Sequence, residues 1–138
     1  MIRLNFYVQS NNWPRRINKV KKITNKVIKE KTNLNFDKNI NYYLNIILLN
    51  NKKIKKLNLK FKKINKTSDV LTFVSTFENI NYNQSKYCDI FFSAETIKLD
   101  SKKNKINFYD HFTHLLVHSF LHINGYMHKR AKDFIKMQ

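Results

Sequence analysis

The first half of the chain changes between two hydrophobic patterns, one typical of strands and one typical of helices. Apolar and polar residues alternate from Leu4 to Val8, which predicts a first strand. Asn12 followed by Trp13 and Pro14 is typical of a helix entry, with proline close to the first turn. Apolar residues then recur at helical spacing, which predicts a helix to about Lys31. The run from Tyr42 to Leu49 is rich in Tyr, Ile and Leu and predicts a second strand.

The middle of the chain continues with a short helix and two further strands. Ile54, Leu57 and Phe61 are spaced to share one face of a helix whose other face is lysine. The segments from Asp69 to Thr76 and from Tyr87 to Ser93 are rich in β-branched and aromatic residues. Both segments are therefore predicted as strands.

The pattern in the last third predicts one long helix. The polar segment from Glu78 to Lys86 is predicted as a loop, and residues 94–106 as a short helix followed by a loop. The segment from about Asn107 to His122 is apolar nearly all round, which predicts a buried helix that ends at Gly125. The order β-α-β-α-β-β-α predicts an α+β fold, with a single mixed β-sheet of about four strands flanked by helices.

Length and composition limit the class of protein. With 138 residues, of which 42% are hydrophobic, we expect residues 1–138 to form a single domain. No apolar run approaches membrane-spanning length, and the first residues lack the pattern of a signal peptide. The single cysteine, Cys88, excludes an intramolecular disulfide. We therefore expect a cytoplasmic protein with no membrane partner and no disulfide-linked partner.

The chain is strongly basic, with 27 Lys and Arg against 9 Asp and Glu and a formal net charge of +18. Eight lysines lie between positions 52 and 66, a segment that we call the lysine patch. One interpretation is a surface that binds the RNA backbone, because basic surfaces attract polyanions. The abundance of Lys, Asn and Ile, whose codons are A/T-rich, supports a second interpretation, in which mutational bias has enriched a solvated surface in lysine.

The histidines form the most specific pattern in the sequence. All five lie between positions 111 and 128, together with the only glycine, Gly125. His118 and His122 are one helical turn apart, so their imidazoles can share one cation. A turn at Gly125 allows His128 to fold back toward this pair. Three neutral nitrogen ligands suit one Zn²⁺ per chain with a fourth position open to water, which favours a catalytic site.

The histidines allow two other interpretations. The first is a purely structural cluster of buried histidines. The second is a metzincin protease, whose pattern matches at the His and Gly positions, but Ser119 stands where that pattern has its catalytic glutamate. The absence of any carboxylate between His118 and His128 argues against a protease. His111 and His114 are interpreted as core or supporting residues rather than as ligands.

Three segments, in the same order along the chain, resemble the YbeY endoribonuclease family, the bacterial rRNA maturation factors. Residues 118–128, His-Ser-Phe-Leu-His-Ile-Asn-Gly-Tyr-Met-His, are similar to the signature H-G-x-L-H-L-x-G-Y-D-H of that family. Residues 57–62 and 67–73 resemble its L-N-x-x-Y-R and P-T-D-V-L-S-F segments. Residues 89–93 resemble its G-D-I-x-I-S strand from the aspartate onward.

The resemblance implies a metal-dependent, single-strand-specific endoribonuclease that acts in 16S rRNA 3′-end maturation and ribosome biogenesis. Its implied cofactor is zinc, and its implied partners are rRNA and the small ribosomal subunit. By motif match, His118, His122 and His128 would be the metal ligands. Lys62 falls on the position of the family's arginine, which implies a contact with RNA phosphate.

The chain departs from the family pattern at four positions. Lys62 keeps the charge of the arginine without its planar fork of donors, and Met127 replaces an aspartate beside the last ligand. Ser119 and Cys88 each replace a glycine. These changes motivate an alternative function, a ribosome-assembly RNA-binding factor with weakened catalysis and a structural metal. A third hypothesis is a metal-dependent hydrolase that acts on another substrate, because three histidines specify a reaction type and not a substrate.

Overall fold

A computed structural model describes residues 1–30, 34–62, 70–78 and 83–125. In these residues one mixed four-stranded sheet is flanked by helices, so the predicted α+β class is confirmed. The strands are β1 (Ile2–Val8), β2 (Ile40–Leu49), β3 (Val70–Glu78) and β4 (Gln84–Ser93). The helices are α1 (Ile17–Glu30), α2 (Asn51–Leu57), α3 (Ala94–Lys103) and α4 (Phe108–Ile123), and the π-helical turn η2 (Asn58–Lys62) follows α2.

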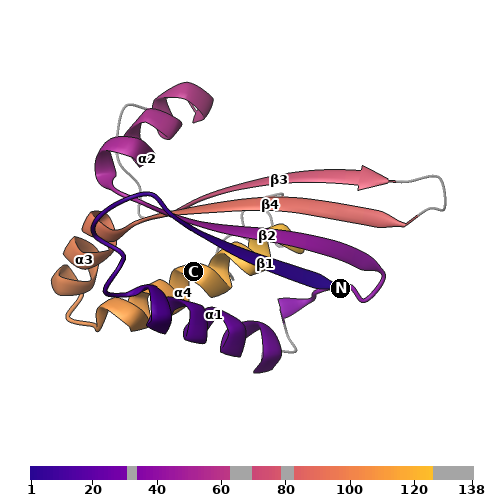
Figure 1. Cartoon of the computed structure of the whole chain (residues 1–138), viewed down its shortest axis with the longest axis horizontal. Coiled ribbons are helices and arrows are strands. Elements are labelled where there is room, and N and C mark those ends of the chain that lie inside the picture. The colour runs from indigo at the N-terminus through magenta and orange to yellow at the C-terminus, as the bar shows by residue number, and fades with distance from the viewer. Residues whose placement is uncertain (31–33, 63–69, 79–82, 126–138) are drawn as a thin grey trace.

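The sheet has the strand order β1-β2-β4-β3. β2 is parallel to both β1 and β4, whereas β3 is antiparallel to β4 and forms an edge of the sheet. Helices α1, α3 and α4 lie against one face, and α2 lies at one end of the other face (Figure 1). The register places Leu44 of β2 between Leu4 of β1 and Cys88 of β4.

The main core lies between the sheet and these three helices. Alternate residues of the two central strands point into it, because successive side chains of a strand face opposite sides. Fully buried members include Leu44, Ile46, Leu48, Ile90 and Phe92 from the sheet, and Phe112, Leu116 and Phe120 from α4. A smaller cluster on the opposite face joins Ile54 of α2 to Ile47, Leu49 and Leu71. This second cluster anchors α2 and the lysines that it carries.

The predicted start of the first helix is wrong. α1 begins at Ile17, after the predicted entry at Asn12 to Pro14, because burial of Trp13 holds the chain before the helix in place. The Trp13 side chain is fully buried, and its indole N–H donates a hydrogen bond of 2.8 Å to the carbonyl oxygen of Leu49. The predicted end at Lys31 lies outside the described residues.

The predicted loop from Glu78 to Lys86 is also wrong at both ends. β3 continues to Glu78 and β4 already begins at Gln84, because Phe77 pairs with Ser85 and Thr76 pairs with Lys86 across an antiparallel ladder. Backbone pairing of this kind does not require the apolar side chains on which the prediction relied.

Two helices differ from their predicted burial. Phe61 does not share the buried face of Ile54, because η2 has a wider turn than an α-helix, and its side chain is 57% exposed. α4 is buried along one side rather than all round, and Asp110 and His114 are exposed. Among the described helices, none has the length and apolar character needed to cross a membrane.

Candidate metal centre

α4 carries the histidines and is fixed at its start by a cap. Asn107 precedes the helix, and its side-chain oxygen accepts a hydrogen bond of 2.8 Å from the backbone N–H of Tyr109. This bond satisfies one of the N–H groups that a helix start leaves without a partner. The side of the helix that carries Phe112, Leu116 and Phe120 then packs into the main core. The remaining side is where most of the histidines lie.

Four of the five histidines lie on α4, and their environments differ. His111 is buried at 9% exposure and belongs to the core, as predicted, whereas His114 is exposed. His118 and His122 are half-buried. The rings of His114 and His118 meet almost perpendicularly, with 5.9 Å between their centroids. His118 and His122 therefore combine a fixed helical spacing with access from solvent, which a cation site requires.

The end of α4 is tied to two distant segments. The Lys86 ammonium of β4 donates a hydrogen bond of 3.0 Å to the carbonyl oxygen of Ile123. The side-chain amide of Asn124 donates one of 2.9 Å to the carbonyl oxygen of Leu34. Gly125 then has a φ of +101°, which side chains disfavour and glycine tolerates. These contacts fix the direction in which the chain leaves His122. The sequence patterns pointed to Gly125 but to neither of the other two contacts.

The donor set fits a zinc ion as far as it is described. His118 and His122 supply two imidazoles from one side of α4, and His128, the third predicted ligand, lies outside the described residues. Within the described part of the chain, three or more His, Cys, Asp or Glu side chains do not gather into a metal site. The Cys88 thiol lies fully buried among the apolar side chains of the main core, and this burial raises its pKa to about 12. The described residues therefore supply two of the three predicted ligands.

Lys62 and much of the lysine patch lie on a different part of the fold. Lys62 is the last residue of η2, and residues 63–69 are not among those described. The preceding lysines of the patch project from α2 and η2, and all are exposed: Lys52, Lys53, Lys55, Lys56 and Lys60. These five lysines form an exposed basic surface next to the second core cluster.

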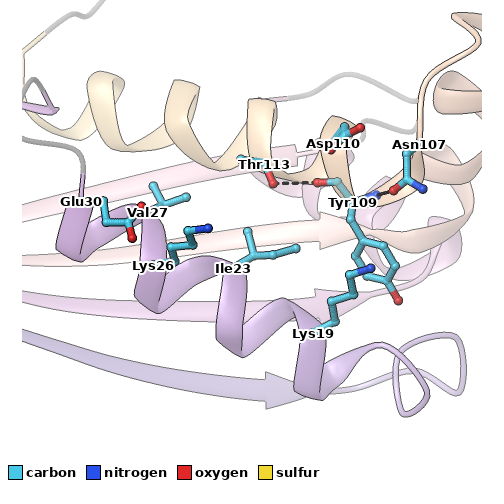
Figure 2. Close-up of a pocket in the computed structure, with 9 residues that line it drawn as sticks. All are labelled: Lys19, Ile23, Lys26, Val27, Glu30, Asn107, Tyr109, Asp110 and Thr113. Carbon is cyan, nitrogen blue, oxygen red and sulfur yellow. Dashed lines mark hydrogen bonds between the residues drawn. The ribbon is translucent and has the colours of Figure 1, made fainter.

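A cavity of about 580 Å³ lies between α1 and the first half of α4 (Figure 2). Its lining mixes Lys19 and Lys26 of α1 with Glu30 and Asp110, and the Lys19 ammonium lies 4.3 Å from the centre of the Tyr109 ring. The described residues that line this cavity include no histidine. It is a crevice between two helices and is separate from the candidate metal centre.

Comparison with known protein families assigns the chain to one of them. The family model described as Endoribonuclease YbeY matches residues 7–138. The chain belongs to the YbeY family. It is 36% identical to the Endoribonuclease YbeY of Ehrlichia chaffeensis, an alignment that covers 96% of this chain and 83% of the relative. The Endoribonuclease YbeY of Pelagibacter ubique is also 36% identical, with 99% and 90% covered.

A solved structure supports the fold. The solution structure of a Thermotoga maritima protein is similar to this chain with a TM-score of 0.58 and 22% identity. The similarity covers 99% of this chain and 84% of that one. YbeY proteins are metal-dependent hydrolases that act on RNA.

Two departures from the YbeY motifs are accommodated inside the fold. Ser119, at a glycine position of the histidine signature, is buried at 4% exposure, and its hydroxyl donates a hydrogen bond of 2.9 Å to the carbonyl oxygen of Leu115. Cys88, at the glycine position of the strand motif, is fully buried in the main core, where it packs as a small apolar side chain. α4 packs against the sheet with both side chains inside the fold.

Proposed function

We propose that this chain is a zinc-dependent, single-strand-specific endoribonuclease of rRNA processing, acting in 16S rRNA 3′-end maturation. The observation that carries the proposal is the half-buried pair His118 and His122 on the accessible side of α4, in a chain of the YbeY family. Residues 1–138 would act as one domain in the cytoplasm, with rRNA and the small ribosomal subunit as partners. The net charge of +18 suits a polyanionic substrate.

Each residue of the proposed site has a separate task. His118, His122 and His128 would hold one zinc ion, with the first two held in position by the core packing of α4. When bound, the ion supplies Lewis acidity toward water and toward the scissile phosphodiester. Lys62 and the exposed lysines beside it would bind the flanking phosphates and hold the strand in place.

The test combines metal analysis with RNA cleavage. Wild type is expected to hold about one equivalent of zinc and to cleave single-stranded RNA, because three imidazoles bind zinc tightly. The double variant His118→Ala/His122→Ala is expected to lose both properties. His114→Ala is the matched control, since this histidine lies on the same helix yet is not a proposed ligand, and it should retain the metal. Lys62→Met should weaken RNA binding while keeping the zinc.

The outcomes separate the candidate functions. A wild-type protein without divalent metal, or a double variant that still cleaves, would overturn the nuclease proposal. Zinc without cleavage, together with salt-dependent binding to small-subunit RNA, would favour the assembly factor with a structural metal. The substitutions at positions 62 and 127 of the family motifs are the observation behind that second candidate. In either case, chelation should lower the thermal midpoint, because a metal that binds only the folded state stabilises it.

A further inference from the structure

The sheet has a second face that the proposed metal centre does not use. Of the described helices, α2 packs on this face, and it covers only the end that holds Ile47, Leu49 and Leu71. Beyond α2, strand residues that point away from α1, α3 and α4 form what we call the open face: Arg3, Asn5, Tyr43, Asn45, Phe73, Ser75, Phe77, Tyr87 and Asp89. The register arranges these side chains in rows across all four strands.

Three aromatic rings form the outer rows of the open face. Tyr43 and Tyr87 stack with their centroids 4.6 Å apart and their planes within 8° of parallel. Phe77 meets Tyr87 at nearly a right angle, with centroids 5.4 Å apart. Tyr87 is 45% exposed and Phe77 is 58% exposed. A hollow of about 590 Å³ opens beside them, lined by Ser75, Phe77, Glu78, Ser85 and Tyr87. The exposed rings of Phe77 and Tyr87 therefore border an open hollow where a planar group can stack on them.

The adjacent row carries amide groups instead. The side-chain amide of Asn5 donates to the oxygen of Asn45 at 3.4 Å, and the amide of Asn45 donates to a carboxylate oxygen of Asp89 at 2.9 Å. This hydrogen bond occupies the one acidic side chain of the open face as defined above. Exposed Arg3 lies beside Tyr43 in the register. Amides, a guanidinium and aromatic rings are the groups that bind unpaired bases and their phosphates.

Charge decides which kind of partner fits this surface. Arg3 lies on the open face, and the exposed lysines of α2 lie at its covered end, among them Lys52, Lys55 and Lys56. Glu78, which lines the hollow, points from β3 toward the other face by its place in the strand alternation. The chain as a whole carries +18. A polyanion with exposed aromatic bases is therefore complementary both to the rings and to the surrounding charge.

We propose that the open face binds single-stranded RNA, with bases stacked on the aromatic rings of Tyr43, Tyr87 and Phe77 and a phosphate on Arg3. The proposal rests on the proposed function, to which it adds a second contact region for the substrate. The edge strand β3 connects the two regions. It contributes Phe73, Ser75 and Phe77 to the open face, and it also contacts α4, which carries the histidines. An RNA strand held on the open face passes around this edge to reach the histidines.

The test measures the affinity of a short fluorescent oligouridine by anisotropy, in the cleavage-deficient His118→Ala/His122→Ala background. Tyr87→Leu and Phe77→Leu are each expected to raise Kd about tenfold, the loss of one base–aromatic stack, with the salt dependence unchanged. Arg3→Gln should instead reduce the slope of log K against log salt by about 0.7, the loss of one phosphate contact on a single strand. Tyr87→Phe keeps the ring and should bind as the background protein does.

The controls separate stacking from general effects. Tyr109→Leu removes a tyrosine on the opposite side of the sheet and should leave Kd unchanged. The affinity for a duplex should not respond to Tyr87→Leu, because paired bases are not free to stack on protein. Circular dichroism of each variant checks folding, and crosslinking with 4-thiouridine RNA should label the peptide that contains Tyr87.

The outcomes distinguish this inference from the proposed function. Unchanged oligouridine affinity in folded Tyr87→Leu and Phe77→Leu overturns the inference even when wild type cleaves RNA. In that case, the open face would instead be a candidate contact for a protein. Conversely, a wild type that never cleaves RNA but binds it through these rings overturns the nuclease and supports the open face as an RNA site.

Discussion

Cys88 lies in β4 between Leu44 and Val74 of the neighbouring strands, with no surface exposed to solvent. Burial raises the pKa of its thiol from 9.0 to about 12, because a thiolate in the core would lose its hydration. The folded protein therefore keeps this proton in a pH range where the unfolded chain releases it. The contribution to stability is complete below pH 9.0 and is lost as the pH rises toward 12.

We expect two consequences of the buried thiol. In the native protein, Cys88 should react with a thiol reagent at neutral pH only at the rate of unfolding. Because the chain has a single cysteine, all of the label reports on this residue. The free energy of unfolding, measured in urea, should fall more steeply above pH 9.0 in wild type than in Cys88→Ala. Fast labelling of the native protein would show that the thiol is accessible. Equal slopes in the two proteins would show that folding does not raise the pKa of the thiol.

Some residues of the candidate site are positioned by local helical spacing, and others by contacts between segments far apart in the sequence. Helical spacing was sufficient to predict that His118 and His122 share one side of a helix and that Gly125 ends it, because these relations are local. Spacing did not reveal that His114 is exposed, since exposure depends on where the sheet lies relative to the helix. The contacts of Lys86 and of Asn124 join segments far apart in sequence, and no local pattern indicates such pairs.

At the level of whole elements, hydrophobic periodicity predicted the strands and helices well and their ends poorly. The start of α1 is set by Trp13, which bonds to the end of β2, and the ends of β3 and β4 are set by ladder hydrogen bonds. Both are tertiary effects. η2 is a further case, because a π-helical turn alters the spacing that placed Phe61 on the face of Ile54.

The end of α4 gives a prediction for the helix as an element. Lys86→Met keeps the alkyl chain but removes the ammonium that bonds to the Ile123 carbonyl and complements the negative end of the helix. The free energy of unfolding should fall by about 1.5 kcal/mol, the lower end of the range for a hydrogen bond from a charged group, because Lys86 is only half-buried. Urea denaturation would measure it. Lys98→Met, an exposed lysine on α3, is the control and should change stability little; equal losses in both variants would exclude a specific role for Lys86.

For the whole molecule, the charge of +18 opposes folding and favours RNA binding. Raising the ionic strength from low salt should therefore raise the thermal midpoint by several degrees, because screening weakens the repulsion among lysines. The rise should be smaller in Lys52→Glu/Lys55→Glu/Lys56→Glu. This variant replaces three lysines of α2 by glutamates, so less repulsion between positive charges is left for salt to screen. Calorimetry over a salt series would measure both. A midpoint that falls with salt, or that rises equally in both proteins, would contradict this account.

The parallel pairings of the sheet also order events during synthesis. Leu4 pairs with Leu44, and Leu44 pairs with Cys88, so the centre of the sheet is complete only after β4 has been made. α4 follows every strand in the chain and packs onto that finished surface. Because domains fold as their segments emerge from the ribosome, the histidine pair acquires its setting late. A nascent chain that still lacks α4 therefore contains neither histidine of the pair and no metal site of the proposed kind.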